Sequence, residues 1–183
     1  SRHESGREAD YVEAWSRSGA VGAAAFVKRR VDEVKRGVTS REEYEREART
    51  IRFDTYKQVL AAHGAPAVFF GHHEGDVQEN VISNVMRGSA LLGLSGMEET
   101  GVISGVAVWR PLLPHGKTDI FEFAHRFGVP YFKDTTPTWA TRGKLRRRLL
   151  PLLEDVYGAG LYAHLSRLAD EANQLRRLTS DVV

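Results

Sequence analysis

The sequence predicts an α/β protein with a doubly wound, mostly parallel sheet and a C-terminal helical extension. Apolar, strand-like runs at 65–70, 106–112 and 129–132 alternate with helical patterns, which is typical of parallel sheets. The character of the chain changes after residue 136, where basic and leucine-rich helical patterns begin. We therefore expect an α/β domain over residues 1–136 and a basic helix with a helical extension over residues 137–183.

Each expected element has a local signal. Residues 6–18 form a helical pattern, and residues 23–31 form a strand-like one. Ser40-Arg-Glu-Glu43 is a capping box, and it begins a helix that runs toward Gly64. The next strand, at 65–70, breaks at Gly71 and leads into a further helix. The remaining expected elements are a loop with a helical turn at 87–97, a strand at 106–112, a helix at 117–127, a strand at 129–132, and helices at 138–149, from 151 and at 161–175.

Composition excludes several classes of protein. The sequence contains no cysteine, so it has no disulfide, thiolate metal site or thiol nucleophile of its own. No apolar run approaches the ~20 residues that span a bilayer, and we expect no membrane partner. The first residues lack the apolar core of a signal peptide. The chain starts at Ser1 rather than Met, and we expect that residues precede it.

Two histidines and two carboxylates follow the strand at 65–70. His72 and His73 come directly after Gly71, and Asp76 and Glu79 lie on the helix that follows. Ligands of open α/β sheets bind at the carboxyl ends of strands, so we predict a site here. An ordinary solvated helix face is the alternative. At about 100° per residue the helix has a polar face and an apolar face, and we expect the apolar face to pack on the sheet. The polar face carries Asp76, Glu79, Ser83 and Arg87, and the apolar face carries Val77, Val81, Ile82 and Val85.

The spacing of these residues does not match a dedicated transition-metal site such as H-E-x-x-H. Magnesium that is held jointly with a nucleotide needs only one or two carboxylates, and Asp76 is the expected ligand. For either histidine alone, the alternative is a buried imidazole bonded to the backbone.

A second candidate surface is basic. Its five cations have no acid among them, and mutual repulsion between them favours a polyanion as partner. The alternative is a solvated helix face whose arginine stems cover leucines. The five residues are Arg142, Lys144, Arg146, Arg147 and Arg148.

Several segments together resemble one family. Gly71-His-His-Glu-Gly-Asp-Val-Gln-Glu-Asn80 and Arg87-Gly-Ser-Ala-Leu-Leu-Gly-Leu-Ser-Gly-Met97 resemble the tRNA(Ile)-lysidine synthases, N-type ATP pyrophosphatases of the PP-loop superfamily. The family patterns are G-H-H-x-D-D-x-x-E-T and R-G-x-G-L-x-G-L-x-G-M. The resemblance covers nearly the whole chain and also includes Ala48-Arg49-Thr-Ile-Arg52-Phe53, Arg110-Pro-Leu-Leu113, Lys133-Asp134, Arg142-Gly-Lys-Leu-Arg146 and Leu149-Leu-Pro-Leu-Leu153.

The sequence departs from the family pattern in four places. Gly75 stands where the family has Asp, Asn80 where it has Thr, and Gly143 where it has Asn. The S-G-G-x-D-S loop that cradles ATP phosphates would lie before Ser1. We therefore expect a C-terminal fragment of a longer enzyme, inactive alone.

The resemblance implies an adenine nucleotide alpha hydrolase-like fold and an ATP-dependent ligase. Such an enzyme adenylates a tRNA cytidine, and lysine then displaces AMP. Asp76 and Glu79 would hold the lysine ammonium or Mg²⁺, His72 and His73 would border the nucleotide beside Gly71, and Arg49, Arg52 and Arg87 would contact substrate or nucleotide. The implied partners are tRNA, ATP and lysine, with a homodimer and a cytoplasmic location also expected; an upstream transit peptide would make the location organellar.

Two other functions stay open. One is a noncatalytic tRNA-binding or regulatory remnant, which Gly75 and the absent phosphate loop favour. The other is a PP-loop enzyme with a different acceptor, which Gly75 and Gly143 leave open. Relatives that thiolate cytidine use cysteines, so the cysteine-free sequence favours lysidine-type chemistry.

Overall fold

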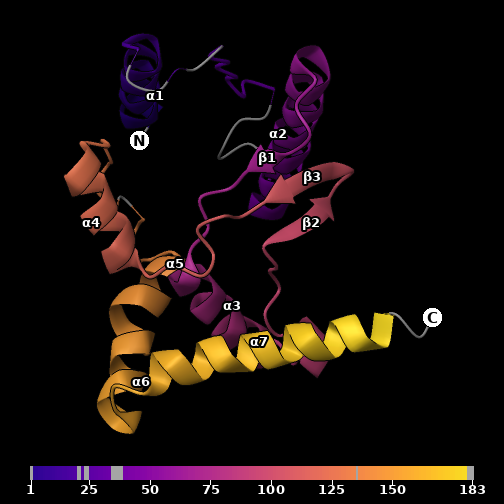
Figure 1. The fold of residues 1–183 in the computed structure, drawn as a ribbon, viewed down its shortest axis with the longest axis vertical. Helices are drawn as coiled ribbons and strands as arrows, with labels where there is room; N and C mark the ends of the chain where they lie inside the picture. Colours follow the sequence, from indigo (N-terminus) through magenta and orange to yellow (C-terminus); the bar gives the residue numbers. More distant parts are fainter. Residues whose placement is uncertain (1, 20–21, 23–24, 34–38, 135, 181–183) are drawn as a thin grey trace. The chain divides into compact units, whose positions relative to one another are not determined.

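A computed structural model describes residues 2–19, 22, 25–33, 39–134 and 136–180 and divides the chain into two compact units (Figure 1). The first unit comprises residues 1–68 and 103–106, and the second comprises residues 69–102 and 107–183. Phe53 and Val106 are buried in the first unit, whereas most of the buried residues belong to the second. Across the described ranges, no helix is both long enough and apolar enough to cross a membrane.

The first unit contains helices α1 (Arg2–Arg17) and α2 (Arg41–His63). As predicted, Ser40 caps α2 by accepting a hydrogen bond from the Glu43 N–H, and Gly64 ends the helix with φ 59°. The strand predicted at 23–31 is wrong where the structure describes it: residues 25–31 form no strand, and residues 23–24 lie outside the described part. The segment is largely exposed and pairs with no neighbouring strand, so its apolar residues do not suffice to make one.

The sheet has three short strands in the order β1 (Val68–Phe69), β3 (Val106–Trp109), β2 (Thr100–Ile103). β2, which the sequence did not predict, is joined to β3 by the two-residue turn Ser104-Gly105. Both turn residues have positive φ, 51° and 76°, as tight hairpins require.

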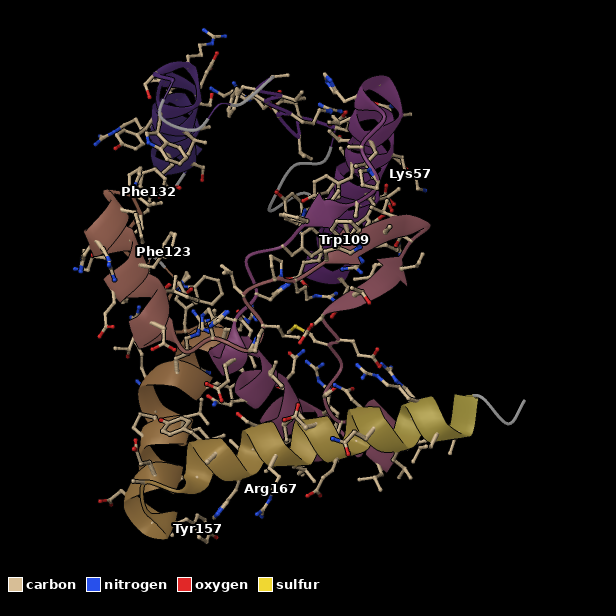
Figure 2. The ribbon with its side chains drawn as sticks, viewed as in Figure 1. Lys57, Trp109, Phe123, Phe132, Tyr157 and Arg167 are labelled. Carbon is tan, nitrogen blue, oxygen red and sulfur yellow. The ribbon has the colours of Figure 1, made fainter. Side chains whose placement is uncertain are left out.

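The doubly wound sheet is not confirmed by these strands. Residues 129–132 were predicted to be a strand, but they form none. Instead, the Tyr131 ring packs 4.9 Å from Phe121 and 5.6 Å from His125, on helix α4 (Lys117–Phe127). Contact with α4 thus replaces strand pairing. The same helix exposes Phe123 and Phe127, whose rings lie 4.5 Å apart (Figure 2).

The core of the second unit lies between helices α3 (Glu74–Met86) and α7 (Leu161–Ser180), which pack against each other (Figure 1). The apolar face of α3 therefore packs mainly on a helix, and the expectation that it packs on the sheet is wrong. Val85 is 46% exposed for the same reason, because α7 contacts other positions. The short helix η1 (Leu91–Gly93) also contacts α7. The buried cluster consists of Val77, Val81, Ile82, Met97, Leu113, Leu145, Leu150, Leu165 and Ala169.

The basic residues lie on two consecutive helical segments, α5 (Thr141–Lys144) and the π-helical η2 (Leu145–Leu149), and α6 (Leu150–Tyr157) follows directly. Pro151 explains why η2 has a wide, π-helical turn. It has no N–H to offer the Arg147 carbonyl, and its ring crowds that carbonyl. The Leu150 N–H bonds to the Leu145 carbonyl instead. One helical stretch therefore runs through the basic cluster with a local π-bulge, a feature frequent at functional sites.

Candidate functional site

The site begins where the chain leaves β1 and turns into α3. His73 caps this helix: its Nδ1 accepts from the Gly75 N–H at 3.0 Å, and its own N–H donates to Asp76 Oδ2 at 3.1 Å. A Cβ at Gly75 would lie 2.8 Å from the His73 ring, so a side chain here would disturb the cap. The Glu74 N–H donates to the His115 carbonyl, which holds the segment after β3 against the start of α3.

Asp76 and Glu79, one turn apart on α3, form a buried carboxylate pair. Their side chains are only 8% and 4% exposed. A buried carboxylate is stable only if it is paired or hydrogen-bonded. Both acids are paired with cations from the basic segment, which comes more than 60 residues later in the chain.

Arg142 and Arg146 are these cations. One Nη of Arg142 lies 2.9 Å from Asp76 Oδ1, and one Nη of Arg146 lies 3.2 Å from the same oxygen. Arg146 Nε also donates to Glu79 Oε1, and Arg146 lies 3.4 Å from Asp134 Oδ2. We call these five residues the carboxylate–arginine cluster. Three carboxylates face two guanidinium groups, so the cluster carries excess negative charge.

One carboxylate oxygen in the cluster is incompletely satisfied. Arg142 Nε lies 3.2 Å from Glu79 Oε2, which is close enough for an ion pair. Its N–H is not directed at the oxygen, however, and Oε2 accepts no hydrogen bond from the described residues. Since Arg142 is half exposed, a competing cation could displace its guanidinium more easily than that of Arg146.

Neighbouring groups shift three pKa values around the cluster. Hydrogen bonds from Thr136, and then the charge of Arg146, lower the pKa of Asp134 to about 2. Burial alone would lower the pKa of Arg146, but the hydrogen bond and charge of Glu79 raise it. Burial also lowers the pKa of His72, so this imidazole is neutral near pH 7. The carboxylate partners of Arg146 thus favour its charged form, and a neutral histidine lies close to the cluster.

The structure brings four of the predicted site residues together. His72, His73, Asp76 and Glu79 lie around the start of α3, as the sequence predicted, and Gly71 precedes them. Arg87 is the C-cap at the other end of the same helix. Arg49 and Arg52 lie exposed on α2 in the first unit, where Arg49 stacks 4.8 Å over the Phe53 ring.

The expectation that the basic residues lack acidic partners is wrong for Arg142 and Arg146. Their partners are distant in sequence, and no local pattern reveals them. The other three residues are exposed; Arg147 donates to the Thr136 carbonyl, and Lys144 and Arg148 make no ion pair with a described residue. These three remain the candidates for a phosphate-binding surface.

Sequence reasoning missed Asp134 and Arg110 as members of the site. Both lie in segments that carry the family resemblance, Lys133-Asp134 and Arg110-Pro-Leu-Leu113, and this was the available signal. Asp134 contacts Arg146. Arg110 is buried, and its Nη1 donates to the Glu98 carbonyl at 2.6 Å.

The arrangement does not fit a magnesium ion that the protein itself holds. Asp76 Oδ1 is occupied by two guanidinium groups, and Oδ2 accepts from the His73 N–H. In the described residues, no group of three or more histidines and carboxylates is arranged to hold a metal. Two adjacent cations would also repel a divalent ion. The carboxylate pair Asp76 and Glu79 instead fits an organic cation, such as an ammonium or guanidinium group.

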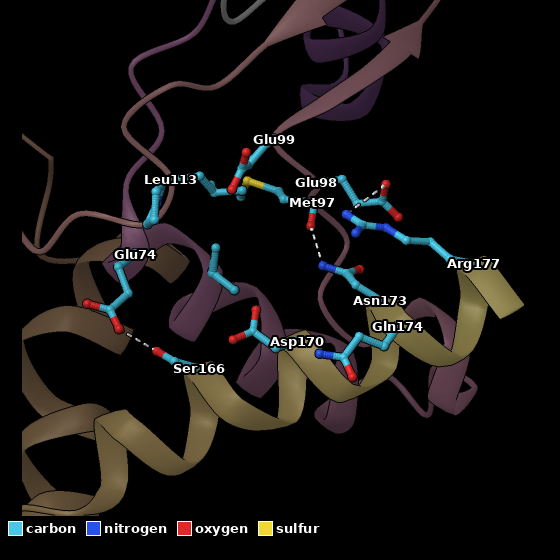
Figure 3. Close-up of a pocket in the computed structure, with 12 residues that line it drawn as sticks. Glu74, Met97, Glu98, Glu99, Leu113, Ser166, Asp170, Asn173, Gln174 and Arg177 are labelled. Carbon is cyan, nitrogen blue, oxygen red and sulfur yellow. Dashed lines mark hydrogen bonds and ion pairs between the residues drawn. The ribbon is translucent and has the colours of Figure 1, made fainter.

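A separate pocket of about 320 Å³ lies between α3, α7 and the segments at 97–99 and 113–114 (Figure 3). Ser166 donates to Glu74 at 2.7 Å, and Asn173 donates to the Met97 carbonyl at 3.1 Å. Arg177 approaches Glu98 at 3.9 Å. The first of these contacts fastens α7 to α3, and the other two fasten it to the loop between η1 and β2.

The PP-loop domain family matches residues 1–153, which is most of the chain. The chain belongs to the PP-loop domain family. This membership also assigns it the α/β fold of that family.

Relatives of this PP-loop chain support the resemblance to lysidine synthases. It is 31% identical to the bifunctional protein TilS/HprT of Listeria innocua over 81% of this chain and 22% of the relative. It is 30% identical to the tRNA(Ile)-lysidine synthase of Chlamydia muridarum over 70% of this chain and 41% of the relative. It is 33% identical to the tRNA(Ile)-lysidine synthase of Chlamydia trachomatis serovar D over 72% of this chain and 42% of the relative. The chain thus spans less than half the length of these relatives.

Proposed function

We propose that this PP-loop chain forms the acceptor side of an ATP-dependent tRNA-modifying ligase of the tRNA(Ile)-lysidine synthase type. The observation that carries the proposal is the buried pair Asp76 and Glu79, which already binds two organic cations in the cluster. A lysine ammonium has the same charge and can donate the same hydrogen bonds. The names of the relatives in Listeria and Chlamydia point to the same chemistry.

The proposed reaction has two steps. The C2 oxygen of a tRNA cytidine attacks the α-phosphorus of ATP, and pyrophosphate leaves. The lysine amine then bonds to C2, the bond between C2 and the AMP oxygen breaks, and the amine protons pass to solvent. Asp76 and Glu79 would hold the incoming lysine, and His72 and His73 would border the nucleotide. Arg49, Arg52 and Arg87 would contact nucleotide or substrate phosphates. ATP would bring its Mg²⁺ with it.

Mass spectrometry of tRNA nucleosides tests this function. In a strain that depends on the encoded full-length protein, Glu79→Gln should reduce lysidine by at least about tenfold, because a neutral amide cannot neutralise an ammonium. Glu42→Gln, an exposed change on α2, is the matched control and should leave lysidine unchanged. Normal lysidine in the Glu79 variant would exclude this acceptor chemistry and leave a different acceptor or a noncatalytic role.

The exposed basic residues would bind the tRNA backbone. Replacing Arg148, which has no ion pair among the described residues, by alanine should lower the slope of log affinity against log salt by about one unit. Arg167→Ala on α7 removes an equally exposed arginine, one that faces Glu171, and should leave the slope unchanged. Equal slopes for wild type and the Arg148 variant, measured by filter binding, would contradict phosphate contact.

The protein would work in the cytoplasm or an organelle, where tRNA is modified, and a homodimer is part of the same proposal.

A further inference from the structure

Arg110 is a buried cation with no acidic partner in the part of the chain that the structure describes. It directly follows β3 and is only 5% exposed. One Nη donates to the Glu98 backbone carbonyl at 2.6 Å, whereas Nε has no acceptor among the described residues. No carboxylate charge offsets its burial, which lowers its pKa. A guanidinium group has five N–H donors, and a single carbonyl leaves most of them unused. Burial of such a group is costly unless an anion completes it.

Backbone hydrogen bonds hold the segment that contains His72 against the segment that contains Arg110. The Phe70 N–H donates to the Trp109 carbonyl at 2.8 Å, and the Glu74 N–H donates to the His115 carbonyl at 3.1 Å. The segments that follow β1 and β3 are therefore held side by side. His72 Nδ1 is buried and has no hydrogen-bond partner in the described part of the chain. The charge of Arg110 helps burial to lower the pKa of His72, which places the two groups within electrostatic reach.

Two adjacent groups thus have unused hydrogen-bonding capacity and no negative charge of their own. The neutral imidazole can carry its proton on Nδ1 and donate it, as the guanidinium can donate from Nε. His72 directly precedes His73, whose backbone N–H donates to Asp76 Oδ2, so the segment of His72 leads directly into the carboxylates of the cluster. An anion subsite close to a pair of carboxylates matches a ligand that carries both charges.

We propose that Arg110 and His72 form an anion subsite next to the carboxylate–arginine cluster, and that it binds the carboxylate of the amino acid whose ammonium the cluster holds. The inference rests on the proposed function, which supplies the amino acid. Phosphate oxygens offer the same chemistry as a carboxylate. A nucleotide phosphate is therefore the second source to distinguish.

Calorimetric titration of the purified protein with L-lysine and with cadaverine, the same diamine without the carboxylate, tests the subsite. The wild-type protein should bind lysine at least about tenfold more tightly than cadaverine, because only lysine has a carboxylate that can pair with the buried Arg110. Arg110→Gln can still donate to the Glu98 carbonyl but has no charge, and it should erase the preference while its affinity for cadaverine stays unchanged. Arg110→Lys should recover part of the preference. Arg167→Gln, an exposed change, should behave as wild type.

A titration with inorganic pyrophosphate separates the two sources of anion. Loss of pyrophosphate binding in Arg110→Gln, with an intact lysine preference, would assign the subsite to nucleotide phosphate. If neither amine binds but pyrophosphate binds through Arg110, the acceptor proposal fails and the anion subsite stands. The subsite is overturned if a folded Arg110→Gln protein, verified by circular dichroism, matches wild type for all three probes.

Discussion

Arg146→Met is expected to destabilise the second unit by about 3 kcal/mol, the lower end of the effect of breaking a buried ion pair. The change leaves Glu79 and Asp76, both almost fully buried, with Arg142 as their only guanidinium partner. Arg142 is half exposed, and it offsets part of the loss. Urea unfolding followed by circular dichroism measures the shift in midpoint at constant m-value.

The matched control is Arg148→Met, two positions away in the same helical segment. Arg148 is exposed and makes no ion pair with a described residue, so its loss should change stability by less than about 0.5 kcal/mol. Combining Glu79→Gln with Arg146→Met should restore part of the stability, because the double variant no longer buries an unpaired charge. Equal midpoints for wild type and Arg146→Met would show that the pairing is not stabilising.

Gly143→Ala is expected to destabilise the same unit by about 2 kcal/mol or more, although alanine normally stabilises a helix relative to glycine by about 1 kcal/mol. A Cβ at this position would lie 2.1 Å from the Pro137 carbonyl oxygen and 3.2 Å from the Thr138 Cα. Both are backbone atoms, which cannot swing aside as a side chain can. α5 would have to move away, and Arg142 would move with it.

Gly93→Ala is the corresponding control, because a Cβ there meets no atom within 4 Å. Thermal unfolding should show a lower midpoint for Gly143→Ala and little change for Gly93→Ala. A stabilised Gly143 variant would mean that α5 does not approach residues 137–138 as closely as described. The contact also gives a physical reason for glycine where the family pattern has asparagine, since any side chain would collide.

Local chemistry determined what could be predicted from the sequence. The Ser40 cap, the Gly64 terminus and the start of α3 after His73 depend on neighbouring residues, and their signals were readable. The strand predicted at 129–132 failed because Tyr131 packs on α4, and local propensity does not contain that contact. The strand predicted at 65–70 contains β1, but its two-residue length and the hairpin strand β2 depend on tertiary pairing that local propensity does not contain.

Most members of the candidate site were predictable from the sequence, but their pairing was not. The order His72, His73, Asp76, Glu79 marked the start of α3, and the Arg142–Arg148 segment was visible as basic. Their meeting is a tertiary contact across more than 60 residues, so the sequence alone suggested free cations where the structure has ion pairs. Arg110 was overlooked because nothing in a strand end reveals that its guanidinium is buried without an acid.

The distance along the chain between the two halves of the cluster affects the order of folding. Asp76 and Arg142 are 66 residues apart, and closing so long a loop carries an entropic cost before any contact compensates for it. Local elements such as α3 and its His73 cap can form early, whereas the ion pairs must wait for the rest of the second unit. During that interval the two acids are hydrated and exposed. The ion pairs therefore form only after this loop has closed.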